Sequence, residues 1–164
     1  QLEDISLQPK PTQKPNPEFW FGGEVRRTWE RAARIGCGWG PWAPTIEHMQ
    51  NGMKAIREVA EAEGRDLANF RFICEAWTAV DNDLKRAESA VEPALSYFVK
   101  HHQMDIGMDF MHSNSFIGSP ENIALRLQEW IDIGVEEFHL AFCPWEKCRE
   151  SMRIVAKEIM PQFQ

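Results

Sequence analysis

Two clusters of glycines are the residues whose type and spacing point most directly to ligand chemistry. Gly22 and Gly23 follow a short apolar run and precede a segment with helical periodicity. Glycine lets the backbone come close to a ligand, and the unpaired N–H groups at the start of a helix attract phosphate. A second cluster, Gly36, Gly38 and Gly40, ends the next apolar segment. The pattern predicts a phosphate site, with simple tight turns as the alternative.

Cysteine and histidine do not form a recognisable metal-binding pattern. Cys143 and Cys148 lie close to His139, but the spacing matches no common zinc site and a fourth ligand is not evident. Cys37 and Cys74 lie in apolar stretches. We therefore predict that the protein binds no metal at these residues and that all four cysteines are buried or semi-buried thiols. His139 lies mid-strand, which favours a core residue over a catalyst.

Three further histidines lie between residues 101 and 117, a segment without a clean period that predicts a loop or short helical insertion. Such a segment can cover a ligand site, although solvated loop histidines are the other interpretation. Trp39 and Trp77 could line a pocket, but burial of aromatic rings explains them equally well. The three histidines between residues 101 and 117 are His101, His102 and His112. No general base is assigned, so the catalytic residues stay unknown.

Repeated strand–helix units must position the glycine clusters. Apolar runs predict strands at 19–22, 36–39, 70–79 and 136–142, each followed by amphipathic helical spacing. Thr45 and Ser119 are predicted helix caps, and Pro93 predicts a kink or break in its helix. The whole chain, 1–164, is one partial domain, with an extended proline-rich lead-in at 1–18 and a helical or loop insertion at 81–118.

The fold class is therefore α/β, with parallel strands, outer helices and a helical insertion before the last βα unit. Four strands are half of a (β/α)8 TIM-type barrel, which needs about 250 residues in total. Periodicity alone leaves a small open doubly wound sheet as an alternative. The absence of an initiator Met at Gln1 suggests a fragment, a processed product or a trimmed form of a longer protein.

Composition restricts the function classes. The formal net charge is −7 with no basic stripe, which argues against nucleic acid or an anionic membrane as a partner. The sequence contains no apolar run of about 18 residues and therefore predicts no transmembrane helix. Its polar N-terminus lacks a signal-peptide pattern. We expect a cytoplasmic protein with reduced cysteines.

An ordered set of short motifs is similar to the C-terminal half of the bacterial luciferase-like monooxygenase family. The motifs, in chain order, are PKPTQKPNPEFWFGG, RAARIGCGW, GRD, FIGSPENIALRLQEWIDIGVEEFHL and VAKEIMP. The resemblance implies a flavin-dependent oxidoreductase or monooxygenase that uses reduced FMN, or a deazaflavin coenzyme instead, at the C-terminal ends of the barrel strands. It implies cofactor-phosphate contacts at Gly22, Gly23, Glu24, Gly38, Trp39 and Gly40. A carboxylate beside a phosphate is repulsive, and Arg26 or Arg27 could offset Glu24 through a charge-assisted contact.

Three functions remain open from sequence. The first is an enzyme portion that acts on a small-molecule substrate together with an N-terminal barrel half absent from this chain. The second is a non-catalytic half-barrel that pairs with itself or another chain to cover its sheet edges. The third is a phosphate-ligand binding module without redox chemistry.

Overall fold

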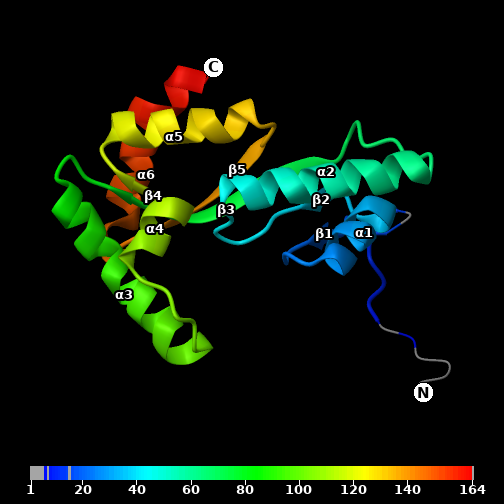
Figure 1. The fold of residues 1–164 in the computed structure, drawn as a ribbon, viewed down its shortest axis with the longest axis horizontal. Coiled ribbons are helices and arrows are strands. Elements are labelled where there is room, and N and C mark those ends of the chain that lie inside the picture. The colour runs from blue at the N-terminus through cyan, green and yellow to red at the C-terminus, as the bar shows by residue number, and fades with distance from the viewer. Residues whose placement is uncertain (1–5, 7, 15, 164) are drawn as a thin grey trace.

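The computed structural model describes residues 6, 8–14 and 16–163, and its centre is a parallel sheet (Figure 1). The sheet has five strands, and all their pairings are parallel. Predicted strands exist at all four expected places, which confirms the parallel α/β architecture. Their bounds are β1 Trp20–Phe21, β2 Gly38–Trp39, β3 Arg71–Val80, β4 Phe116–Gly118 and β5 Glu137–Phe142.

β3 organises the sheet because every other strand except β1 pairs with it. β5 pairs with residues 73–78 of β3, whereas β2 pairs with its first two residues and β4 with its last three. Backbone groups of successive strand residues point to opposite edges. The even-numbered carbonyls of Phe72 and Thr78 accept from Glu136 and Cys143, while the odd-numbered Glu75 carbonyl accepts from Ala43. β5 therefore occupies one edge of β3, and β2 and then β4 share the other.

The helices divide between the two faces of the sheet. Helices α1, α2 and α5 pack on one face, together with the C-terminal helical segment, whereas α3 and α4 cover the other face near the carboxyl end of β3 (Figure 1). The bounds are α1 Arg26–Ile35, α2 Ile46–Ala62, α3 Leu84–His102, α4 Met108–Asn114, α5 Pro120–Asp132 and α6 Cys148–Ile154. None of the helices in the described ranges is long and apolar enough to cross a membrane.

Local sequence signals set most helix boundaries. Thr45 caps α2 by accepting from His48 N–H, and Ser119 caps α5 by accepting from Asn122 N–H, as predicted. Asp83 caps α3 in the same way. These side chains satisfy N–H groups that have no partner inside the helix. Gly36 ends α1, at its predicted position.

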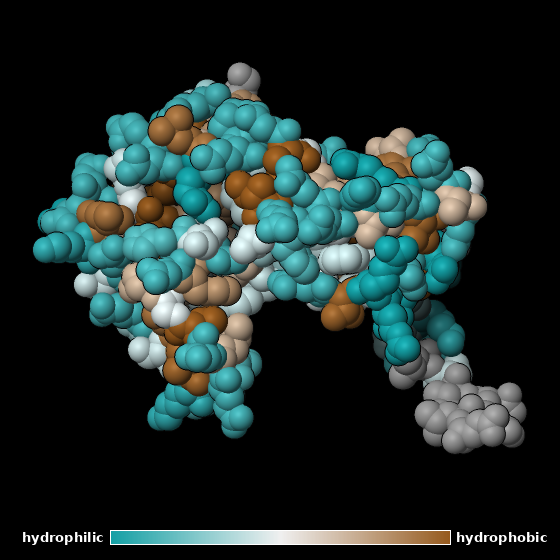
Figure 2. All heavy atoms as spheres, in the orientation of Figure 1, coloured by the Kyte–Doolittle hydropathy of each residue, from teal (hydrophilic) through white to brown (hydrophobic). Residues whose placement is uncertain are grey.

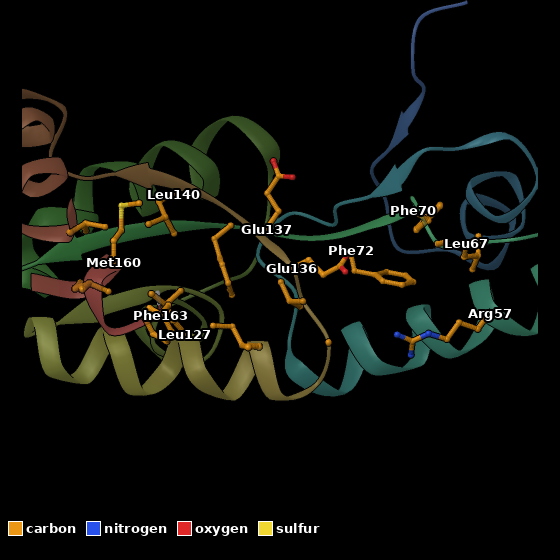
Figure 3. Close-up of a pocket in the computed structure, with 17 residues that line it drawn as sticks. Arg57, Leu67, Phe70, Phe72, Leu127, Glu136, Glu137, Leu140, Met160 and Phe163 are labelled. Carbon is orange, nitrogen blue, oxygen red and sulfur yellow. The ribbon is translucent and has the colours of Figure 1, made fainter. Parts of the chain in front are cut away.

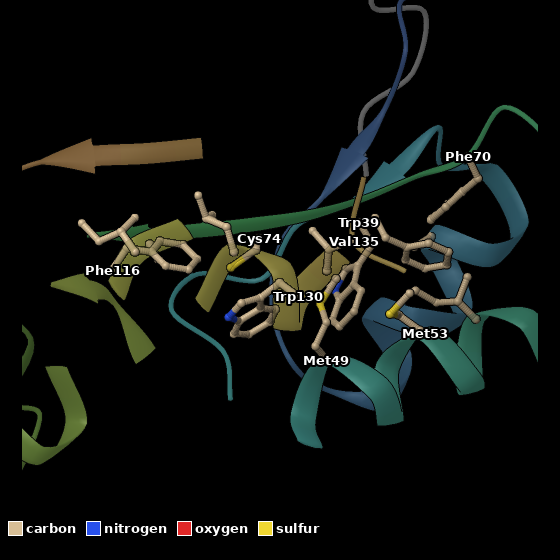
Figure 4. Close-up of a cluster of buried hydrophobic side chains, with 14 of the residues drawn as sticks. Trp39, Met49, Met53, Phe70, Cys74, Phe116, Trp130 and Val135 are labelled. Carbon is tan, nitrogen blue, oxygen red and sulfur yellow. The ribbon is translucent and has the colours of Figure 1, made fainter. Parts of the chain in front are cut away.

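The main core lies between β3 and the helices α1, α2 and α5 (Figure 4). Phe72, Cys74 and Ala76 point from β3 into this core, where they meet Trp39 and Trp130. Since side chains alternate along a strand, Trp77 and Ala79 point the opposite way and pack against α3 and α4. Both faces of β3 are thus covered at its carboxyl end.

Arg65 ties the C-terminus of α1 to the turn after α2. Its guanidinium donates hydrogen bonds to the carbonyls of Ala32, Ala33 and Gly36 at the end of the helix. The Ala32 carbonyl also accepts from the Gly36 N–H, whereas the last carbonyls of a helix otherwise lack an intrahelical partner. We expect Arg65→Met to lower the free energy of unfolding by about 1–2 kcal/mol, the scale of losing charge-assisted hydrogen bonds. Urea unfolding measures this change. The exposed Arg31 is the control, and an equal loss in Arg31→Met would contradict the capping role.

Three details differ from the sequence prediction. Residues 116–118 form strand β4 rather than part of a loop, because they pair with the end of β3. Of the kink or break predicted at Pro93, the break does not occur, because helix α3 continues past this residue. The last helical segment continues past the expected end near residue 160 to Phe163, in π and 3-10 turns after α6. No helix or strand is assigned among the described residues before Trp20. Residues 1–5, 7 and 15 of the predicted 1–18 lead-in lie outside the described residues.

Candidate functional site

The two predicted glycine turns lie side by side at the carboxyl ends of β1 and β2. Trp20 pairs with Gly38 and Phe21 with Trp39, so the turns follow at the same level. Gly40 N–H donates to the Phe21 carbonyl at 3.0 Å. A Cβ atom on Gly22 would lie 3.6 Å from the Gly40 carbonyl oxygen. The structure therefore brings the two glycine turns into direct contact, where the sequence predicted only that they end neighbouring strands.

Gly23 requires glycine for its backbone conformation. Its φ is +90°, a region that residues with a Cβ atom rarely adopt. Its carbonyl accepts a 2.9 Å hydrogen bond from the indole N–H of Trp39. The Gly23 carbonyl is thus held toward the Trp39 indole, and Gly23 itself is exposed. The main chain of this turn therefore lies at the surface, next to the start of α1.

The N-terminus of α1 differs from those of α2, α3 and α5. Val25 occupies the N-cap position and provides no side-chain hydrogen bond to the first turn. The N–H groups of Arg26 and Arg27 in that first turn have no acceptor within the helix. Unpaired N–H groups and the helix dipole favour an anion at such an end. A phosphate is chemically compatible with this end.

The charged side chains near the turn pair differently from the sequence prediction. Arg26 contacts Glu30 at 3.1 Å, within α1, rather than offsetting Glu24. The Glu24 carboxylate instead lies 3.7 Å from Nε2 of His48, in the first turn of α2. Of the two arginines predicted to offset Glu24, Arg26 pairs instead with its i,i+4 neighbour on α1, and among the described residues no ion pair joins Arg27 to Glu24.

Gly38 and Trp39 occupy different positions from the other candidate contacts. Both lie within β2, and the Trp20 ring covers the Cα of Gly38. The Trp39 side chain is fully buried and faces the helices. Its contribution to the site is the hydrogen bond that holds the Gly23 turn. Gly22, Gly23, Glu24 and Gly40 are the candidates that lie at the strand ends.

A cluster of aromatic rings, which the sequence did not reveal, lies between the loop after β2, the carboxyl half of β3 and the helices α3 and α4. Trp42 stacks on Phe98 of α3 at 4.7 Å between ring centroids and meets Trp77 edge-on at 4.8 Å. Phe110 of α4 lies at 6.3 Å from Trp42. Trp77 also lines a cavity of about 460 Å³ beside α3 and the loop after β5. For Trp39 and Trp77 the sequence left pocket-lining and burial open; Trp77 lines this cavity, and Trp39 is buried in the core.

The histidines hold no recognisable catalytic arrangement. His139 was predicted in the core, but its side chain is 52% exposed and its Nε2 lies 2.9 Å from Glu137 Oε1. The reason is strand alternation: Phe138 and Leu140 pack toward the helices, and His139 points to the opposite face. His112 on α4 contacts Glu88 at 2.8 Å. The other two insertion histidines lie exposed at the end of α3 rather than in a loop.

The cysteines are all free, and burial raises the pKa of the Cys74 thiol to about 12. Burial also raises the pKa of Cys143. Neither thiol is therefore activated as a nucleophile at neutral pH. Across the described ranges, no three His, Cys, Asp or Glu side chains gather in a way that would bind a metal ion.

A cavity of about 960 Å³ lies on the helix side of the sheet, near the amino ends of β3 and β5 (Figure 3). Its walls include Phe72, Leu127 and Phe163. In (β/α) barrels, ligands bind at the opposite, carboxyl ends of the strands. This cavity therefore lies apart from the glycine turns.

Three solved structures share the fold. An F420-dependent secondary alcohol dehydrogenase, in complex with an F420-acetone adduct, matches with a TM-score of 0.80 and 19% identity over 99% of this chain and 53% of its own. Monooxygenase RslO1 from Streptomyces bottropensis matches with a TM-score of 0.76 and 19% identity over 96% and 51%. The third is the oxygenating constituent of 3,6-diketocamphane monooxygenase from Pseudomonas putida, in complex with FMN, with a TM-score of 0.68 and 14% identity over 90% and 49%.

These matches show that the chain spans about half the length of its structural relatives. Its parallel sheet and helices correspond to one half of a (β/α) barrel, so the predicted half-barrel fold is confirmed. The family model described as luciferase-like monooxygenase matches residues 1–137, most of the chain. The chain belongs to the luciferase-like monooxygenase family.

Proposed function

We propose that this chain is the cofactor-phosphate-binding half of a flavin-dependent monooxygenase that uses reduced FMN and dioxygen on a small-molecule substrate. The observation that carries this proposal is the pair of adjacent glycine turns at the ends of β1 and β2, next to the uncapped start of α1. Main-chain N–H groups of Gly22, Gly23 and Glu24, and the turn at Gly40, are the proposed phosphate contacts. Gly38 and Trp39 support them from within β2.

When bound, the reduced flavin supplies the reaction with dioxygen. The residues of this chain have three tasks in the proposal. The glycine turns anchor the phosphate, and the aromatic cluster around Trp42 and Trp77 excludes water. The helices α3 and α4 form the boundary of the substrate space. No side chain of this chain is assigned a proton-transfer role.

A deazaflavin coenzyme is the second candidate, and its reaction would be hydride transfer without oxygen activation. The structural match to an F420-dependent alcohol dehydrogenase favours it. The phosphate-binding turns suit both cofactors because both carry a phosphate.

Enzyme assays on the complete barrel distinguish the two candidates. With reduced FMN in air, we expect dioxygen consumption and an oxygenated product. Anaerobic hydride transfer from the reduced deazaflavin, without reaction from FMN, would assign the second candidate. Binding of cofactor without turnover of either would favour a phosphate-ligand module.

The partner we propose is the other half of the barrel. β1, β4 and β5 each pair with a single neighbour among the described strands, so each has one unpaired edge there. The sheet face opposite the main core carries exposed Trp20, Glu75 and His139. An uncovered face and the free edges of β1 and β5 are surfaces that a further set of parallel strands would cover. Without that half, a second copy of the chain is the expected occupant.

We therefore expect the 164-residue chain alone to self-associate or to bind an apolar dye. Trp20 is a large apolar side chain that is 44% exposed on that face. Light scattering and dye fluorescence measure both effects, and Trp20→Ser is expected to weaken them. Trp145→Ser, at an 81% exposed position elsewhere, is the control. A monodisperse wild-type monomer that binds no dye would contradict the open face.

The non-catalytic half-barrel is the remaining alternative. It predicts the same self-association but no cofactor binding in any assembly. Cofactor titration of the completed barrel separates it from the enzyme.

A further inference from the structure

Ala43 has an unusual backbone conformation in the loop that connects β2 to α2. Its φ is +44°, a left-handed region that is unfavourable for a residue with a Cβ atom. The residue is 3% exposed and stands between Trp42 and Pro44. Strained residues of this kind persist only where the surrounding structure holds them.

Two hydrogen bonds from distant parts of the chain hold Ala43. Its N–H donates to the carbonyl of Glu75 on β3 at 2.6 Å. Its carbonyl accepts from the side-chain amide of Asn114, at the end of α4, at 2.7 Å. Asn114 is 6% exposed, and a buried amide of this kind is destabilising without a partner. The insertion helix α4 thereby fixes the loop that follows β2.

The conformation of Ala43 determines where the preceding Trp42 lies. Trp42 pairs with Glu75 through an isolated parallel bridge, and its ring is enclosed by Phe98 and Trp77. Phe98 also meets Trp77 edge-on, at 4.8 Å between centroids. Trp77 therefore has its orientation set by two rings, one of which belongs to the loop that Asn114 holds.

Trp77 forms one wall of the cavity of about 460 Å³ at the carboxyl ends of β3 and β5. Ala94 of α3, Ala141 of β5 and Pro144 form further apolar walls. Trp145 lies at the rim and is 81% exposed. Glu146 is the one charged residue of the lining, and the remaining walls are mainly aromatic and small apolar, which suits a planar apolar group.

Resting on the proposed function, we propose that Asn114 is a positioning residue that holds Ala43 and Trp42, and thereby orients Trp77 as the wall of a pocket for an apolar ring of the substrate. Asn114 itself does not contact the ligand. Its effect passes through the left-handed Ala43.

The first test uses the relief of backbone strain by glycine. Asn114→Ala is expected to lower the melting temperature by roughly 3–8 °C, and to change the near-UV circular dichroism of the Trp42–Trp77 pair. Adding Ala43→Gly should restore at least half of both changes, because glycine adopts a positive φ without strain. Ala68→Gly is the matched control, and Asn122→Ala controls for the loss of an exposed amide.

The second test measures binding of naphthalene, a planar apolar probe, by tryptophan fluorescence. Asn114→Ala should weaken binding at least fivefold, and Ala43→Gly should recover it. Ala94→Leu, which fills the cavity with an aliphatic side chain, should weaken binding while leaving the dichroism of the tryptophan pair unchanged. A lower melting temperature with unchanged dichroism and unchanged naphthalene affinity would overturn the positioning role, as would absence of rescue by Ala43→Gly.

The outcome is separable from that of the proposed function. Naphthalene binding does not require the phosphate turn, so it should be unaffected by Gly23→Val. Loss of cofactor binding with intact naphthalene binding would reject the flavin proposal and keep the pocket.

Discussion

Trp39→Ala is expected to lower the free energy of unfolding by about 3–5 kcal/mol, the range for removing a large buried aromatic side chain. Trp39 is fully buried in the core between β2 and the helices (Figure 4). Its ring lies edge-on to Trp29 at 6.1 Å between centroids and fills the space beside Gly52, which has no Cβ. Truncation would leave a cavity that these close neighbours cannot fill. It would also remove the hydrogen bond to the Gly23 carbonyl.

Chemical denaturation of matched variants measures this effect. Trp145→Ala removes the same side chain from an 81% exposed position, and we expect a change within about 0.5 kcal/mol. Trp39→Phe keeps much of the ring but lacks the N–H donor, so it isolates the contact with the Gly23 turn. A stability loss in Trp39→Ala no larger than that in Trp145→Ala would contradict the packing described for the core.

Gly23→Val is expected to weaken cofactor binding in the complete barrel by about 1–3 kcal/mol, the scale of losing a buried hydrogen bond to a charged group. Two causes act together. Valine cannot adopt a φ of +90° without strain, so the turn must rearrange. A Cβ atom would also lie 3.4 Å from Thr28 Oγ1, in the first turn of α1, and its methyl groups would crowd the proposed phosphate position.

The control for strain alone is Gly64→Val. Gly64 has a φ of +65°, and a Cβ atom there would have no neighbour within 4 Å. This variant should lose stability but bind cofactor as the wild type does. Fluorescence titration of the cofactor against both folded variants provides the comparison. Equal affinity in the two variants would remove the phosphate from the Gly22–Glu24 turn.

Elements with local signals were predictable from the sequence. The apolar runs located β1, β2, β3 and β5, and the cap residues Thr45 and Ser119 located the starts of α2 and α5. The adjacency of Gly22 and Gly40 was also predictable, since consecutive parallel strands lie next to each other. In these cases a few neighbouring residues determine the outcome.

Features that depend on distant contacts could not be predicted from the sequence. β4 is only three residues long and exists because it pairs with the end of β3. The strained Ala43 depends on Asn114, which lies 71 residues further along the chain. His139 was predicted in the core because it lies mid-strand. The covering of the sheet face by α3 stops between Glu75, which is exposed, and Trp77, which is buried, and this boundary depends on the distant helix.

The most direct test of the central claim, that this half of the barrel binds the cofactor phosphate, compares FMN with riboflavin by isothermal titration calorimetry. The two ligands share the flavin ring and differ in the phosphate. In the complete barrel we predict that FMN binds at least tenfold more tightly than riboflavin, and that Gly23→Val removes this difference while leaving riboflavin affinity unchanged. Should the deazaflavin be the cofactor, the same comparison is made with its phosphorylated and dephosphorylated forms. Equal affinity of the wild type for both members of each pair would contradict the account.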